Sequence, residues 1–135
     1  FFQIILGAFV SGLDAGRIYQ TWPLMGSTYF PNDILLKIFN NLINFNNHSL
    51  VQFYHRNLAY LMTFYILILG LYIFLKNLKN LFYPFKLLLS LLLIQIFLGV
   101  FTLISDLNIY LASAHQINSV ILVFSAINLY YFRTK

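Results

Sequence analysis

The 135-residue chain is strongly apolar: 61% of its residues are hydrophobic, only 8% are charged, and its mean hydropathy is +0.80. A soluble domain usually carries about 25% charged residues, so this composition leaves too little polar surface to face water and indicates a membrane protein. The chain contains no cysteine, which excludes disulfides and thiolate metal sites within it. The net charge of +5 does not suggest a nucleic-acid partner, because the basic residues flank the apolar stretches instead of forming a patch.

Four apolar stretches predict helices, since in lipid a helix pairs its backbone polar groups within its own segment. The first, at about residues 1–13, is shorter than the roughly 20 residues that a membrane span needs, and we interpret it as a partial helix cut from a longer one. The other three follow at about residues 49–75, 84–104 and 109–132. We therefore expect an all-α fold, a polytopic four-helix membrane bundle forming a single domain over residues 1–135.

One long connection, residues 14–48, separates the first two helices. Glycine and proline residues break helical structure along it, and a connection of this length in a compact bundle is typically a lid or a binding loop. Within the connection, Asn32–Ile43 is predicted to form a short amphipathic helix with an Asn or Asp cap, lying along the membrane interface.

Lysine and arginine predict the orientation, because they are more frequent in cytoplasmic loops. Five basic residues lie in the link between the second and third helices or at the C-terminus, whereas three lie on the other side. The loop at 14–48 is therefore expected on the outer side. The five residues are Lys76, Lys79, Lys86, Arg133 and Lys135, and the three are Arg17, Lys37 and Arg56.

A short internal repeat links the two halves of the chain. The segment Gln3-Ile-Ile-Leu-Gly7-Ala-Phe matches Gln95-Ile-Phe-Leu-Gly99-Val-Phe at five of seven positions. Each copy lies in a helix that is followed by a helix bearing a histidine near its start. The chain is therefore predicted to consist of two repeated helical hairpins, related by a pseudo-twofold axis along the membrane normal.

The two histidines, His55 and His115, lie about six residues into their helices, which corresponds to roughly 9 Å along each axis. Ionisable side chains are costly in hydrocarbon, so both are candidate functional residues. Two opposed imidazoles at one depth suit the axial ligation of a haem iron. Zinc or copper sites usually need further ligands, which the spans do not offer, and the simplest alternative is a polar residue at the interface. Arg56 and Arg17 are candidate partners for haem propionates, or interfacial anchors.

Four blocks of the sequence resemble haem A synthases, in the order that this family has them. They are Gly7-Ala-Phe-Val-Ser-Gly-Leu-Asp-Ala-Gly16-Arg-Ile-Tyr-Gln-Thr-Trp-Pro-Leu-Met25, Val51-Gln-Phe-Tyr-His55-Arg56-Asn-Leu-Ala-Tyr60, Gln95-x-x-x-Gly99-Val-Phe-Thr-Leu103 and Leu111-Ala-Ser-Ala-His115-Gln116. The family has eight helices in two similar halves, and this chain resembles the C-terminal half, beginning within the fifth helix.

The resemblance implies a membrane oxidoreductase of haem biosynthesis, needed for cytochrome c oxidase assembly. It implies that His55 and His115 are the metal ligands of a resident haem b, with Arg56 and Arg17 as further cofactor-binding candidates. The family oxidises the C8 methyl of haem O to the formyl group of haem A. The substrate haem O is expected in the other half, which this chain lacks, so no catalytic residue is assigned.

The resemblance also implies the partners and the location. Besides haem O and membrane lipid, we expect an electron donor such as a ferredoxin, and contact with haem O synthase or a second copy of the chain. The expected location is an energy-transducing inner membrane, bacterial or mitochondrial, in which the protein is a multi-pass integral protein.

Two other classes of function remain open on the residues alone. One is a non-catalytic b-type cytochrome, acting as an electron-transfer or membrane-anchor subunit. The other is a transporter or assembly protein whose histidines handle protons or metal. The chain has no phosphate-binding glycine loop, no serine–histidine–acid set and no paired carboxylates within the spans, so a redox cofactor would have to carry any chemistry.

Overall fold

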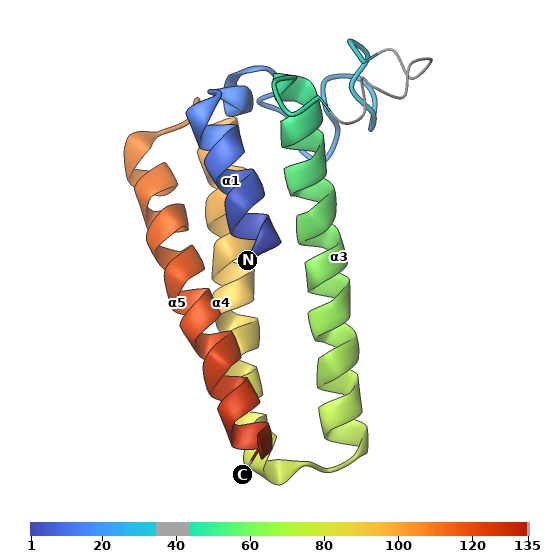
Figure 1. The fold of residues 1–135 in the computed structure, drawn as a ribbon, viewed down its shortest axis with the longest axis vertical. Coiled ribbons are helices and arrows are strands. Elements are labelled where there is room, and N and C mark those ends of the chain that lie inside the picture. The colour runs from blue at the N-terminus through green and yellow to red at the C-terminus, as the bar shows by residue number, and fades with distance from the viewer. Residues whose placement is uncertain (35–43, 135) are drawn as a thin grey trace. The chain divides into compact units, whose positions relative to one another are not determined.

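The structure, a computed structural model, describes residues 1–34 and 44–134, and in these residues all regular elements are helical (Figure 1). The all-α expectation is therefore confirmed. The short helix expected within Asn32–Ile43 falls almost entirely outside the described residues. In chain order the elements are α1 (Phe2–Gly12), the 3-10 turn η1 (Ala15–Arg17), α3 (His48–Leu75), α4 (Lys79–Ile104) and α5 (Ile109–Thr134).

Three of these helices are long and apolar enough to cross a membrane. They contain 28, 26 and 26 residues, more than the roughly 20 that a bilayer core requires. Large apolar side chains are exposed along all three, as Phe64, Phe97 and Phe124 illustrate with exposed fractions of 64%, 58% and 66%. Such surfaces are stable against lipid rather than water, which supports a membrane helical protein.

Helix α4 begins at Lys79, five residues before the start that the sequence predicts at Pro84. Proline often marks the first position of a helix, and that preference led to the later prediction. The helix extends further because Asn77 adopts a left-handed conformation (φ 51°) that closes the turn after α3 within three residues. Pro84 then lies in the second turn, where its missing N–H removes one backbone hydrogen bond.

The described residues divide into two compact units. The first comprises Phe1–Tyr60 with Val100–Asn108, and the second comprises Leu61–Gly99 with the chain from Ile109 onward. The single-domain organisation expected from the sequence remains a prediction. Each expected hairpin places its Gln-x-x-x-Gly segment and its histidine in the same unit: Gln3, Gly7 and His55 in the first, and Gln95, Gly99 and His115 in the second.

Each unit has its own core. In the first unit the loop and the start of α3 provide it, with buried residues that include Ala15, Met25, Leu50 and Val51. In the second unit a larger apolar cluster joins α3, α4 and α5, formed by Ile66, Ile73, Leu81, Phe85, Leu88, Leu92 and Leu129. Within the candidate spans the alternative to such packing is lipid, so van der Waals contact rather than the hydrophobic effect stabilises the second cluster.

Candidate functional site

His55 lies on α3 beside two residues of α1. The amide nitrogen of Gln3 lies 3.2 Å from Nδ1 of His55 and donates a hydrogen bond to the backbone carbonyl of His55 at 3.0 Å. Gly7 lies one turn further along α1, and a Cβ added there would come within 3.3 Å of Cε1 of the ring. The ring of His55 is therefore held between an amide and a glycine of the same helix.

His115 on α5 has a corresponding environment on α4. Its Nδ1 lies 3.1 Å from the backbone carbonyl of Gln95, and its Nε2 lies 3.2 Å from the side-chain amide nitrogen of Gln95. A Cβ added to Gly99 would come within 2.8 Å of Cε1 of the ring, closer than real Cβ contacts allow. The absence of a side chain at Gly99 is therefore what lets the ring lie against α4.

The glutamine and glycine of the internal repeat lie against a histidine ring in each unit. Glutamine and glycine four residues apart lie on one face of a helix, because residues i and i+4 are stacked one turn apart. Both positions can therefore lie against the same histidine ring. We call each set, Gln3–Gly7–His55 and Gln95–Gly99–His115, a histidine cradle.

The two cradles differ in how they bind the ring nitrogens. A backbone carbonyl only accepts hydrogen bonds, so Nδ1 of His115 must carry the proton, and its Nε2 then presents a lone pair. In the first cradle Nδ1 of His55 faces an amide nitrogen instead. The oxygen of that amide, Oε1 of Gln3, is buried and has no hydrogen-bond partner among the described residues.

Asn118 supports the second cradle and was missed by the sequence analysis. Its side chain is 7% exposed and donates to the carbonyl of Leu91 at 3.1 Å and to Oε1 of Gln95 at 2.7 Å. The second bond orients the Gln95 amide so that its nitrogen points toward His115. An available signal was the position of Asn118, a polar residue in an apolar helix, three residues after His115 and so on the same face.

Arg56, next to His55, anchors the loop that precedes α3. Its guanidinium donates to the carbonyl of Tyr19 at 2.9 Å and to that of Leu24 at 3.2 Å. Gln52, one turn earlier on α3, donates to the same Tyr19 carbonyl at 2.9 Å. Arg17 is in a different setting, since it is largely exposed and its only ion pair among the described residues is with Asp14 at 4.0 Å.

Asp33 attaches the loop to the start of α3 and was also not singled out from the sequence. Its two carboxylate oxygens accept hydrogen bonds from Tyr19 at 2.9 Å and from Ser49 at 2.6 Å. Desolvation raises the pKa of Tyr19 above its ordinary value, and the hydrogen bond and negative charge of Asp33 act in the same direction. Tyr19 therefore remains a hydrogen-bond donor at neutral pH.

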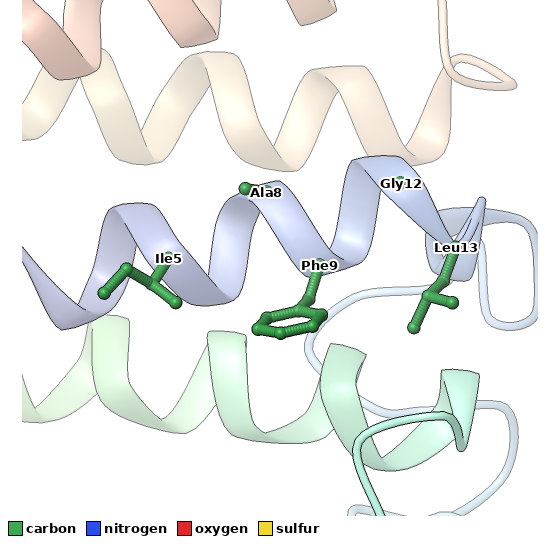
Figure 2. Close-up of a pocket in the computed structure, with 5 residues that line it drawn as sticks. All are labelled: Ile5, Ala8, Phe9, Gly12 and Leu13. Atoms are coloured by element: carbon green, nitrogen blue, oxygen red, sulfur yellow. The ribbon is translucent and has the colours of Figure 1, made fainter.

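Two further features bear on the chemistry. No group of three or more potential metal-binding side chains occurs within residues 1–34 and 44–134. An open apolar groove on α1, lined by Ile5, Ala8, Phe9, Gly12 and Leu13, contains no polar side chain (Figure 2).

Comparison with known proteins places the chain in a family. A family model described as "Cytochrome oxidase assembly protein" matches residues 1–127. Among curated proteins, the haem A synthase of Pelagibacter ubique (strain HTCC1062) is 46% identical over 129 residues, covering 91% of this chain and 36% of the relative. The haem A synthase of Wolbachia sp. subsp. Brugia malayi (strain TRS) is 45% identical over 120 residues, which cover 89% of this chain and 34% of the relative.

A third relative, the haem A synthase of Maricaulis maris (strain MCS10), is 39% identical over 125 residues, which cover 90% of this chain and 36% of the relative. The chain thus spans about a third of the length of these curated relatives. No solved structure matches it. Because the family model covers all but the last eight residues, this chain belongs to the cytochrome oxidase assembly protein family.

Proposed function

We propose that this chain is the haem-b-binding part of a haem A synthase, the enzyme that oxidises the C8 methyl of haem O to the formyl group of haem A. The observation that carries the proposal is the pair of matching histidine cradles, at His55 and His115, in a chain 46% identical to a haem A synthase. In this proposal the two histidines are the axial ligands of one haem b.

The Nδ1 side of each cradle fits haem ligation, and at His115 the iron would take the place of the Gln95 amide nitrogen that lies 3.2 Å from Nε2. An imidazole that binds iron through Nε2 carries its proton on Nδ1, and that proton needs an acceptor. For His115 the acceptor is the backbone carbonyl of Gln95. For His55 the unpartnered, buried Oε1 of Gln3 is the nearby amide oxygen able to accept. When bound, the haem would supply one-electron redox chemistry.

The proposed substrate, electron donor, protein contacts and location are those expected for a member of the haem A synthase family. Substrate haem O is proposed to bind outside this chain, in the rest of the protein, with an electron donor such as a ferredoxin. Contact with haem O synthase, or with a second copy, is proposed on the same basis, and so is an inner-membrane location. Arg56 and Arg17 stay candidate partners for propionates; Arg56 would do this in addition to holding Tyr19 and Leu24.

A reduced-minus-oxidised absorbance spectrum of the full-length protein, purified in detergent, tests the haem assignment. We expect a low-spin α-band that disappears in His55→Ala and in His115→Ala. The matched control is His48→Ala, because His48 is exposed at the start of α3 and outside both cradles. If either cradle variant kept the wild-type band, the ligand assignment would be wrong.

The enzymatic part of the proposal needs its own assay. Full-length protein should convert haem O to haem A when supplied with an electron donor, and both cradle variants should lose this activity. A protein that keeps its haem band but makes no haem A under any donor would instead be a b-type cytochrome subunit, the alternative class of function.

A further inference from the structure

We propose that Gln3 is a positioning residue for His55: its side-chain oxygen accepts the Nδ1 proton of His55 when Nε2 binds iron. This inference rests on the proposed function. It goes beyond it by assigning the partner that sets the electron-donating strength of one ligand. It also predicts that the two histidines are controlled by different means, one by a side chain and the other by the backbone.

The Gln3 amide has hydrogen-bonding partners at its nitrogen but none at its oxygen among the described residues. Its nitrogen donates to the carbonyl of His55 at 3.0 Å and lies 3.2 Å from Nδ1, while its oxygen is buried without a hydrogen-bond partner among the described residues. Leaving a buried amide oxygen without a hydrogen-bond partner is unfavourable. Because the two ends of an amide are nearly the same size, a half-turn places the oxygen at Nδ1 within the same space.

The orientation of the Gln3 amide is coupled to iron binding by His55. With a proton on Nδ1, the half-turn exchanges the hydrogen bond that the amide nitrogen donates to the His55 carbonyl for one that the amide oxygen accepts from Nδ1. That exchange is favoured when iron takes the lone pair of Nε2 and so keeps the proton on Nδ1. Gly7 keeps the ring next to α1, since a Cβ there would be 3.3 Å from Cε1. Outer hydrogen bonds of this kind fix the tautomer and the orientation of a ligating histidine, and raise its basicity.

His115 differs from His55 in the group that accepts its Nδ1 proton. There the Nδ1 acceptor is the backbone carbonyl of Gln95, which is present whatever side chain occupies position 95. The side chain of Gln95 faces Nε2 instead and is tied to Asn118. Substitution at Gln3 therefore removes an Nδ1 acceptor, whereas substitution at Gln95 does not. Gln95→Leu is the matched comparison for Gln3→Leu.

The test uses full-length protein with bound haem and measures the midpoint potential, the low-spin electron paramagnetic resonance spectrum and the haem affinity. In Gln3→Leu the histidine becomes a weaker donor, so the potential should rise and the affinity should fall by about tenfold or more. In Gln3→Glu the stronger acceptor should lower the potential. Gln95→Leu should produce a smaller change in potential than Gln3→Leu.

Opposite shifts for Leu and Glu at position 3 distinguish positioning from a merely structural role, which would move both variants the same way. Shifts of equal sign, or an equal shift in Gln95→Leu, would overturn the inference. The proposed function fails separately: it fails if His55→Ala or His115→Ala keeps the haem band. If both histidine variants lose the band but Gln3 variants leave the potential unchanged, only the present inference fails.

Discussion

At the scale of single residues, two glycines decide how closely each histidine ring approaches the neighbouring helix. The space differs between them: an added Cβ would lie 2.8 Å from Cε1 of His115 at Gly99 but 3.3 Å from Cε1 of His55 at Gly7. A contact below 3 Å forces the ring to move, whereas one at 3.3 Å needs only a small adjustment. The two positions are therefore expected to tolerate alanine unequally.

Gly99→Ala should displace the His115 ring and lower haem content several-fold, while Gly7→Ala should have a smaller effect. Overpacking of this kind costs about 1–3 kcal/mol, here partly offset by the higher helix propensity of alanine. The ratio of Soret to protein absorbance measures haem content. Gly12→Ala is the control, since a Cβ there meets nothing within 4 Å. Equal haem loss in all three variants would contradict this explanation.

The sequence was informative about these residues to different degrees. The repeat singled out Gln3, Gly7, Gln95 and Gly99, because identical residues recurred at a fixed spacing in an apolar background. The repeat could not show that the Gln3 amide faces Nδ1 of His55 whereas the Gln95 amide faces Nε2 of His115. That difference depends on side-chain rotamers and on the backbone position. The sequence did not single out Asn118, because its role is to orient Gln95, which lies on another helix.

At the scale of elements, the loop before α3 is held to that helix by polar contacts as well as by the small apolar core around Met25 and Leu50. The backbone turns sharply at Gly26 (φ 74°), where Met25 N–H bonds to the Thr28 carbonyl at 2.8 Å. Glycine and proline predicted a turn-rich loop, but the sequence alone gave no sign that Arg56 anchors it. Arginine beside a proposed ligand suggested a haem contact, which stays a prediction; the structure adds hydrogen bonds from Arg56 to two loop carbonyls.

Arg56→Gln should release the loop and speed tryptic cleavage after the exposed Arg17. Hydrogen bonds from a charged donor contribute about 1.5–3 kcal/mol, so the loss should raise local opening by about tenfold or more. Limited proteolysis in detergent, followed by mass spectrometry, gives the rate. Arg56→Lys keeps the charge but not the forked geometry of the guanidinium. Its cleavage rate should therefore lie between those of the wild type and Arg56→Gln. A cleavage rate unchanged in Arg56→Gln would show that other contacts suffice.

The second unit has an element-scale contact of its own, between α3 and α4. A Cβ added to Gly70 would lie 2.2 Å from Cζ of Phe85, which is 2% exposed in the apolar core. The phenylalanine ring therefore packs directly on the backbone of α3. The sequence alone does not indicate which residue packs against this glycine.

Gly70→Ala should lower the thermal unfolding temperature in detergent, because the Phe85 ring has no room to move within the core; the expected cost is about 1–3 kcal/mol. Phe85→Leu removes part of the ring and should restore space for the new methyl group. The double variant should then be more stable than the sum of the single effects predicts. Strict additivity would mean that the two side chains do not compete for one space.

At the scale of the whole molecule, composition predicted a membrane helical protein because lipid allows few alternatives. Three spans of 26–28 residues fit that environment, and they follow one another with short connections after Leu75 and Ile104. Element ends depended on local turn geometry instead, so α4 starts before Pro84. Which side of the membrane the loop faces is a property of the charges that flank the spans.

Because three candidate spans separate them, the loop around Ser27 and the end of α5 at Thr134 should lie on opposite sides of the membrane. Five basic residues near the C-terminal side of the bundle against three near the loop predict that Ser27 is outside and Thr134 is inside. This chain has no cysteine, so Ser27→Cys and Thr134→Cys each add one exposed thiol to it. In right-side-out vesicles, a membrane-impermeant maleimide should label Ser27→Cys directly and Thr134→Cys only after permeabilisation. Labelling of Thr134→Cys alone without permeabilisation would show that the predicted orientation is wrong. Labelling of both variants without permeabilisation would contradict an arrangement with three spans between the two positions.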